Sequence, residues 1–311
     1  MDQGYNDIEK ALRLRGYYLK ELVGEGGTAK VYRVKEERDG KEYACKVSDH
    51  LSWLGLEAEL LRSVCHPLFP KWKDDWEYNG IRYMIMEYIA GNSLEEYMTR
   101  RRRFTQGEAV RIALELADGL GYLHERNPRI IYRDLKPSNV ILQPDGRARL
   151  LDLGAASVPD GWRAGTPGYA SPEQHLSGNP VASHQSGEAA IFQRSGGASI
   201  SLQPASDVYS LGIMMHYMLS GRNPLLSREE IRPLRKYASG IWLGLDDIIW
   251  RCLSEQPEER IPGMRELVRE LSTYHNRGKL QIARQEMKVI FRKLSGKKVV
   301  YSKNVWMSEY K

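Results

Sequence analysis

The periodicity of apolar residues changes near Ala90-Gly91, and this change constrains the fold more than any other feature. From Tyr17 to that point, apolar and polar residues alternate in short segments, as in β-strands with one buried face. Beyond it, apolar residues recur at three- and four-residue spacing, as on one face of a helix. The sequence therefore predicts a β-rich part followed by a helical part.

The strand-like segments of the β-rich part are YYLKELVGEG, AKVYRVKEE, KEYACKVS, KWKDDWEY and IRYMIMEY. Asp39-Gly40 and Asn79-Gly80 separate neighbouring segments, and such pairs favour hairpin turns. One helical pattern, LGLEAELLRSV, interrupts the strands and ends before His66-Pro67. We expect an antiparallel sheet with one helix that closes near Glu87.

In the helical part, SLEEYMTRRRR and QGEAVRIALELADGLGYLHERN are predicted helices, the second ending at Asn127-Pro128. Short strands are expected on both sides of the polar residues in IIYRDLKPSNVIL, and further helices from about 207 to 275. The predicted fold class is α+β, with a small antiparallel β lobe that contains one helix and a larger, mainly α lobe.

The predicted boundaries are an N-terminal extension over 1–16 with a short helix, a β lobe over 17–89, a helical lobe over 90–275 and a basic tail over 276–311. Residues 175–204 are rich in Ser, Gly and Gln and are expected to form a flexible insertion. The tail has one apolar helical face. It is interpreted either as a helix packed on the larger lobe or as a basic helix that contacts a membrane surface or a partner.

Composition excludes several other classes of protein. A net charge of +6 in 311 residues is mild and scattered, so no nucleic-acid partner is expected. The three cysteines are far apart and form no CxxC pair, which favours free thiols in a reducing compartment. No signal peptide or membrane-spanning run is recognisable, and we expect a cytoplasmic protein.

A glycine cluster in the stretch VGEGGTAKV lies between two strand-like segments. Glycines let the backbone approach an anion and donate N–H groups to it, although a glycine-rich hairpin can also be a simple turn. The residues concerned are Val23, Gly24, Glu25, Gly26, Gly27, Thr28, Ala29 and Val31.

Lys46 lies in the strand-like segment YACKV, where alternation puts it on the same face as Ala44. It can be a solvated edge residue. If it points inward, however, it requires a counter-charge, because an unpaired buried ion is costly. Glu57 on the following helix is the preferred candidate, and Glu59 is the alternative.

Two further stretches bring carboxylate, amide and amine groups next to apolar runs. Asp134, Lys136 and Asn139 lie in the polar stretch RDLKPSN, residues 133–139, and Asp152 lies in LLDLG. Asn139 and Asp152 carry the oxygen ligands that Mg²⁺ prefers. Asp134 can accept a proton from a hydroxyl, and Lys136 can neutralise charge on a transferring phosphoryl group.

In order and spacing, the motifs VGEGGTAKV, ACK, a helical Glu, YRDLKPSN, DLG and GTPGYASPE resemble the signature of eukaryotic-type (Hanks-type) serine/threonine protein kinases. The resemblance covers about residues 17–274, and GTPGYASPEQ is similar to bacterial members. It implies the bilobal kinase fold and a signalling enzyme that phosphorylates protein Ser/Thr hydroxyls with ATP and also autophosphorylates. Mg²⁺ would be the metal, with Mn²⁺ as an alternative.

Roles follow from this resemblance position by position. Residues 24–31 would cover the ATP phosphates, Lys46 would contact them and pair with Glu57, and Asn139 and Asp152 would be the metal ligands. Asp134 would be the catalytic base and Lys136 the phosphate-contacting lysine. Met86 would be the gatekeeper, and Glu87 to Ile89 the hinge that contacts the adenine edge through backbone groups. Val23, Ala44 and Leu142 are further residues expected to bind the nucleotide.

The resemblance also implies contacts that support the site. Thr166 would hydrogen-bond Asp134 and Lys136, Glu173 would pair with Arg260, and Asp207 would hold the catalytic loop. Ala29 stands where a third glycine is usual, Leu153 where phenylalanine is usual, and Tyr132 where histidine is usual; activity is expected to survive all three. The separation of Lys46 and Glu57 is short for the family, so the helix must be truncated at its N-terminal end.

Regulation is the least determined part. Arg133 commonly contacts a phosphate on the segment from Asp152 to Glu173, but that segment is short, and activity is expected to depend little on phosphorylation of Ser157. Serines in 175–204 could be autophosphorylation sites. Two other functional classes stay open: a catalytically inactive kinase-like scaffold and a small-molecule phosphotransferase of the same fold.

Overall fold

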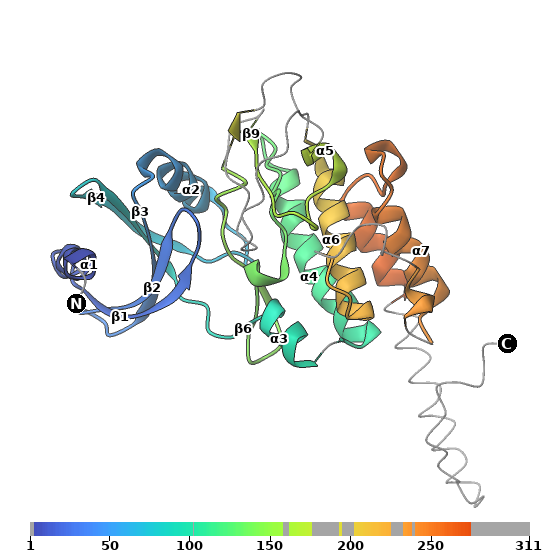
Figure 1. The fold of residues 1–311 in the computed structure, drawn as a ribbon, viewed down its shortest axis with the longest axis horizontal. Coiled ribbons are helices and arrows are strands. Elements are labelled where there is room, and N and C mark those ends of the chain that lie inside the picture. Colours follow the sequence, from blue (N-terminus) through green and yellow to red (C-terminus); the bar gives the residue numbers. More distant parts are fainter. Residues whose placement is uncertain are drawn as a thin grey trace, which may run out of the picture.

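The computed structural model describes residues 3–101, 103–157, 162–175, 193–194, 202–224, 233–237 and 240–274. It has two lobes joined after strand β5 (Ile81–Glu87): a β-rich lobe at the N-terminal end and a larger helical lobe (Figure 1). The predicted α+β class with this division into lobes is confirmed.

The β-rich lobe contains one antiparallel sheet with the strand order β1-β2-β3-β5-β4. Besides β5, its strands are β1 (Tyr17–Glu25), β2 (Lys30–Glu36), β3 (Glu42–Ser48) and β4 (Trp72–Tyr78). The β4–β5 turn has φ of +50° at Asn79 and +73° at Gly80, as a type I′ hairpin turn requires. Both predicted hairpins are therefore present.

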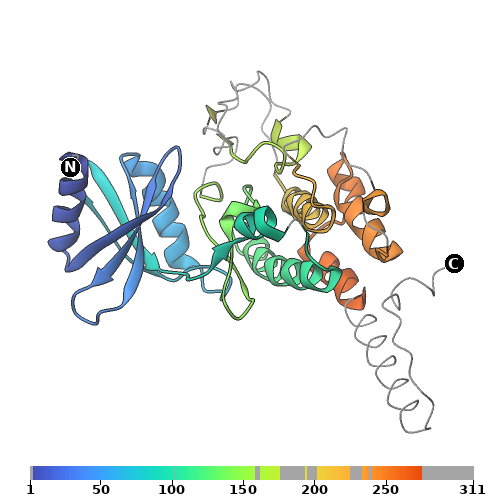
Figure 2. The ribbon, with the colours of Figure 1, turned by 60° about the horizontal axis from the view of Figure 1, so that its bottom comes forward.

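Helices cover both faces of this sheet (Figure 2). Helix α2 (Leu51–Ser63) packs on one face, and α1 (Gln3–Arg13) on the other. Successive side chains of β3 point to opposite faces of the sheet. Ala44 joins the main core on the α2 side, whereas Cys45 and Val47 join Leu12 of α1 in a second core. The sheet is therefore a central layer.

Helices dominate the larger lobe. Its described elements include α3 (Leu94–Arg101), α4 (Gln106–His124), α5 (Pro172–His175), α6 (Pro204–Ser220), α7 (Leu243–Cys252) and a helix over residues 264–274. Within the described residues, single-turn 3₁₀ helices lie at Pro137–Asn139, Leu234–Lys236 and Pro257–Glu259. Helix α4 begins with a capping box, in which Thr105 and Glu108 satisfy each other's backbone N–H groups.

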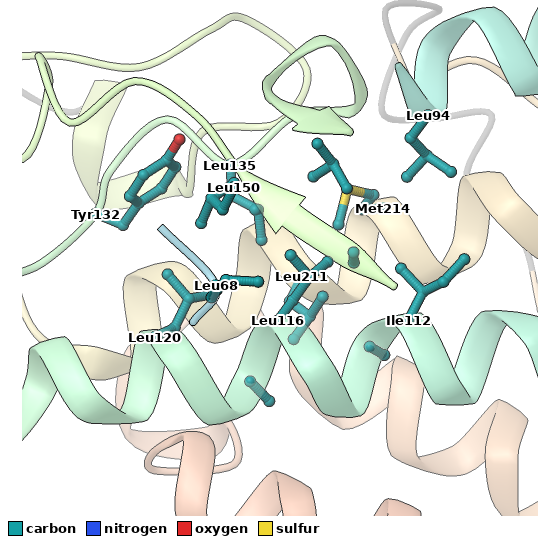
Figure 3. Close-up of a cluster of buried hydrophobic side chains, with 14 of the residues drawn as sticks. Leu68, Leu94, Ile112, Leu116, Leu120, Tyr132, Leu135, Leu150, Leu211 and Met214 are labelled. Atoms are coloured by element: carbon teal, nitrogen blue, oxygen red, sulfur yellow. The ribbon is translucent and has the colours of Figure 1, made fainter. Parts of the chain in front are cut away.

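The larger lobe also contains a small sheet of short strands next to the polar stretch, residues 133–139. They are β6 (Asn92–Ser93), β7 (Val140–Leu142) and β8 (Ala148–Leu150), paired in that order. Figure 3 shows Leu150 and Leu135 packed over α4 and α6 with Leu116 and Leu211. The loops that leave these strands are therefore supported by a fully buried core.

One sequence prediction is wrong: residues 130–132 do not form a strand. The backbone N–H of Ile130 donates to Leu123 O, and that of Tyr132 donates to the Asp207 carboxylate at 2.8 Å. Because these donors are used in that way, no neighbouring strand is required. The apolar run after the polar stretch does form the predicted strand, β7.

Most of the expected insertion lies outside the described residues, as does the tail over 276–311. The described part of the insertion includes β10 (Gln193–Arg194), which pairs antiparallel with β9 (Trp162–Arg163). No helix in the described ranges is long and apolar enough to cross a membrane.

Candidate active site

Lys46, Glu57 and Asp152 form an ion-pair cluster where the two lobes meet. The Nζ atom of Lys46 lies 2.7 Å from Oε2 of Glu57 and 2.9 Å from Oδ1 of Asp152. Helix α2 begins at Leu51, soon after β3 ends, so a short separation in sequence is enough to bring Glu57 to Lys46. Glu59 is exposed on the same helix and is not the partner.

The charges of this cluster follow from its burial and contacts. Burial raises the pKa of Glu57 to about 7, against the opposing effect of Lys46. Burial also works against ionised Asp152, but the charge and hydrogen bond of Lys46 lower its pKa to about 2. Although burial by itself lowers it, the charges of Asp152 and Glu57 raise the pKa of Lys46 above its ordinary value. Lys46 is therefore a fixed cation at neutral pH, and Asp152 a fixed anion.

Asp134 is buried at the centre of a second polar cluster. Its Oδ1 accepts a hydrogen bond from Thr166 Oγ1 at 2.6 Å, and its Oδ2 lies 3.0 Å from Lys136 Nζ. Lys136 also donates to Thr166 Oγ1 at 2.9 Å. Asn139 Nδ2 donates to the backbone oxygen of Asp134 at 2.9 Å. A carboxylate, a cation and a hydroxyl therefore meet at one point.

The two aspartates have opposite pKa shifts. Burial raises the pKa of Asp134 above its ordinary value, against the effects of Lys136 and Thr166. The pKa of Asp152 is lowered, as described above. Divergent environments of this kind separate a carboxylate suited to accept a proton from one suited to stay ionised.

The backbone before Asp134 is held by a buried carboxylate. Asp207, which is fully buried in α6, accepts the backbone N–H groups of Tyr132 and Arg133, each at 2.8 Å. Arg133 has φ of +71°, a left-handed conformation that costs a non-glycine residue roughly 1–2 kcal/mol. His124 Nε2 lies 2.8 Å from the same carboxylate and fixes its position.

Asn139 and Asp152 have the chemistry of a hard-cation site. Because Asn139 Nδ2 is directed at Asp134, the amide oxygen is the atom that remains for a metal. Asp152 stays anionic, and its side chain is about 45% exposed, so part of the carboxylate is accessible. Amide and carboxylate oxygens suit Mg²⁺ or Mn²⁺, so the residues fit such an ion.

The glycine-rich residues form the exposed turn between β1 and β2. Gly26 N donates to Ala29 O at 2.9 Å, and Ser48 of β3 donates to Thr28 O at 2.5 Å. Behind this turn, the remaining residues expected at the nucleotide site lie on β2, β3, β5, β7 and the segment after β5. They are Val31, Ala44, Met86, Glu87, Ile89 and Leu142, of which Ala44, Met86, Ile89 and Leu142 are buried.

Arg149 is a residue near this site that the sequence analysis missed. From β8, its guanidinium contacts the Glu87 carboxylate at 2.7 and 3.2 Å and donates to Phe69 O at 3.0 Å. The end of β5 is therefore joined to β8 of the larger lobe by an ion pair. The signal was available, because Arg149 alternates with the apolar residues Ala148 and Leu150, as Lys46 does in β3.

Glu173 and Arg260 form the ion pair expected from the sequence resemblance. Both carboxylate oxygens accept from the guanidinium, at 2.7 and 2.8 Å, and the Arg260 side chain is fully buried. Burial opposes ionisation of Glu173, but the hydrogen bonds from Arg260 and Ser206 lower its pKa to about 2. This pair fixes the segment that carries Thr166 to the larger lobe.

Comparison with known proteins agrees with this geometry. The protein kinase domain family matches residues 17–282. The chain is 27% identical over 251 residues to the probable serine/threonine-protein kinase pknA2 of Bifidobacterium longum, covering 75% of this chain and 30% of the relative. It is 30% identical over 288 residues to the serine/threonine-protein kinase pkn2 of Myxococcus xanthus, covering 82% and 32%.

A human relative, the cAMP-dependent protein kinase catalytic subunit PRKX, is 30% identical over 229 residues, which cover 70% of this chain and 57% of the relative. The chain thus spans less than two thirds of the length of each of these relatives.

Proposed function

The chain belongs to the protein kinase family, and on this basis we propose that it transfers the γ-phosphoryl group of ATP to serine and threonine hydroxyls of proteins. The observation that carries the proposal is the contact of Lys46 with both Glu57 and Asp152. This contact joins the β3 lysine, helix α2 and the proposed metal ligand of the larger lobe in one arrangement. Such an arrangement positions phosphates, and positioning supplies most of the catalysis in phosphoryl transfer.

Asp134 is proposed as the base. It already accepts the Thr166 hydroxyl at 2.6 Å, so a substrate hydroxyl can be bound in the same way. On reaction, Asp134 takes the proton of the substrate hydroxyl. Lys136, whose Nζ lies 3.0 Å from Asp134 Oδ2, stabilises the charge that develops on the γ-phosphoryl group. The side chains that orient Asp134 come from the chain itself, so the base is positioned before substrate arrives.

ATP is proposed to lie between the glycine-rich turn and β7. The proposed contacts are Val23, Gly24, Glu25, Gly26, Gly27, Thr28, Ala29, Val31, Ala44, Lys46, Met86, Glu87, Ile89 and Leu142. Asn139 and Asp152 would hold Mg²⁺ or Mn²⁺, which when bound neutralises charge on phosphate oxygens. Proteins with accessible Ser/Thr residues are the proposed substrates, and the chain itself is included among them.

Incubation with radiolabelled ATP, Mg²⁺ and a basic acceptor protein tests the proposal. We expect label on serine and threonine of the acceptor, none on tyrosine, and loss of labelling when the metal is chelated. Asp152→Ala serves as the inactive control and excludes a contaminating kinase. Nucleotide binding without transfer would instead indicate a scaffold, and label only on small molecules would indicate a different phosphotransferase.

Ser157→Ala is expected to keep wild-type activity. The Ser157 hydroxyl donates to Gly154 O at 2.8 Å, a contact within its own segment, and Thr166 is held by Asp134 and Lys136 without a phosphate on Ser157. Steady-state kinetics on the variant, with mass spectrometry of the wild type, check this prediction. Stoichiometric phosphate on Ser157 together with an inactive alanine variant would contradict it.

The cytoplasm is the proposed location. Cys45, Cys65 and Cys252 are free thiols, and Cys45 and Cys252 are buried. Unpaired cysteines are typical of reducing compartments.

A further inference from the structure

Gln174 is a buried amide that makes four hydrogen bonds in the larger lobe. From α5, its Nε2 donates to Arg133 O at 2.9 Å and to Ala164 O at 2.7 Å. Its Oε1 accepts from both N and Oγ of Ser171, each at 2.9 Å. An amide has two donor hydrogens and two acceptor lone pairs, so every group of Gln174 is used.

The two carbonyls that Gln174 binds belong to different segments of the proposed active site. Arg133 immediately precedes Asp134, and Ala164 lies two positions before Thr166. The side chains of Asp134 and Thr166 meet at 2.6 Å. One amide group therefore joins the backbones of the two segments whose side chains form the contact at the base.

Gln174 also completes the restraint on a strained residue. Arg133 has φ of +71°; its N–H is held by Asp207, and its carbonyl is held by Gln174. Left-handed non-glycine residues persist where the surroundings fix them on several sides. Asp207 of α6 fixes the N–H group of Arg133, and Gln174 of α5 fixes its carbonyl.

The two segments approach so closely here that only glycine fits between them. Gly165 has φ of +132°, and a Cβ atom on it would lie 2.8 Å from Gln174 Nε2 and 3.1 Å from Arg133 O. The amide of Gln174 therefore lies directly against both backbones.

We propose that Gln174 is a positioning residue, which holds the segment of Thr166 against the loop of Asp134 and so aligns the base for phosphoryl transfer. The link uses only neutral groups, so it forms without any added charge on the segment between Asp152 and Glu173. This role rests on the proposed kinase function. It differs from that of the neighbouring ion pair, because Glu173 contacts Arg260 and Ser206 and neither of the two active-site backbones.

Two variants separate alignment from simple support of the fold. Gln174→Glu keeps the oxygen that accepts from Ser171 but replaces the Nε2 donor with an oxygen that faces two carbonyl oxygens. Gln174→Met keeps a similar volume and removes all four hydrogen bonds. Gln106→Glu is the matched control: its amide donates to Gly240 O at 2.8 Å and accepts from Trp242 N at 2.9 Å, at the start of α4 and outside the proposed site.

The measurements are kcat for a protein acceptor, the dissociation constant of ATP and the midpoint of thermal unfolding. For both Gln174 variants we expect kcat to fall by about tenfold or more, since a small misplacement of reacting groups is costly. ATP affinity is expected to stay unchanged, because Lys46, Glu57 and Asp152 do not contact Gln174. Gln106→Glu is expected to keep both kcat and ATP affinity.

Wild-type kcat in both Gln174 variants would overturn the positioning role while leaving the kinase function intact. Parallel loss of kcat and ATP affinity would also overturn it, because Gln174 would then support the fold as a whole. An absence of transfer by the wild-type protein would overturn the proposed function, and this role with it.

Discussion

Replacing Asp134 with asparagine is expected to lower kcat by roughly 10²–10⁴-fold, the usual contribution of a general base. The substitution keeps the size and shape of the side chain, so Thr166 Oγ1 can still donate to Oδ1 at the position where it now lies 2.6 Å away. The amide cannot accept a proton, however, and it places an NH₂ group near Lys136. Binding of ATP should persist, because Lys46 and Asp152 are untouched.

The comparison requires kcat and the ATP dissociation constant for the wild type and the variant. Asp49→Asn is the matched control. It makes the same chemical change at the surface, where the Asp49 side chain is 82% exposed. Full turnover in the Asp134 variant would show that another group accepts the proton. Lost ATP binding would show that Asp134 supports the site and is not specifically its base.

Replacing Arg260 with alanine is expected to lower the free energy of unfolding by roughly 3–5 kcal/mol, because one partner of a buried ion pair is then left unpaired. Arg260 donates to both oxygens of Glu173 and to the backbone oxygens of Ser254, Ala205 and Glu255, at 2.7 to 3.1 Å. Its removal leaves a carboxylate and three carbonyls without these donors. Urea unfolding of the wild type and the variant measures the difference.

Glu173→Gln provides the control for charge. The pKa of Glu173 is about 2 in the folded protein, below its ordinary value of 4.5, so folding favours the ionised form. The stabilisation is therefore complete above pH about 4.5 and is lost as the pH falls toward about 2. The difference in unfolding free energy between the wild type and Glu173→Gln should shrink over this range. A pH-independent difference would contradict the assignment of the ion pair.

Much of the fold was predictable because its signals are local. Alternation in β3 predicted that Lys46 and Ala44 share a face, and the Asn-Gly and Asp-Gly pairs marked both hairpins. The order of lobes follows from the change in apolar periodicity near Gly91. Each of these signals depends on residues close together in sequence, which set side-chain direction and turn geometry directly.

The rest depends on partners distant in sequence. The run 130–132 has the composition of a strand, but its N–H groups bond to Asp207 and Leu123, which no local pattern specifies. Gln174 belongs to the same class, because one of its hydrogen bonds reaches Arg133, 41 positions earlier in the chain. The sequence alone shows neither that Gln174 is buried nor which groups it hydrogen-bonds.

Helix α1 lies outside the matched family domain, yet it packs against the strands that carry the glycine-rich turn. Tyr17 of β1 and Tyr32 and Val34 of β2 join Leu12 of α1 in the second core, so both strands are anchored on the α1 side of the sheet. This packing ends before the turn, because Leu22 and Val23 of β1 are exposed, as are Gly26, Gly27 and Thr28. The strands that carry the proposed phosphate-binding turn therefore depend on a helix beyond the family domain, and removal of α1 would expose the second core of the sheet to solvent.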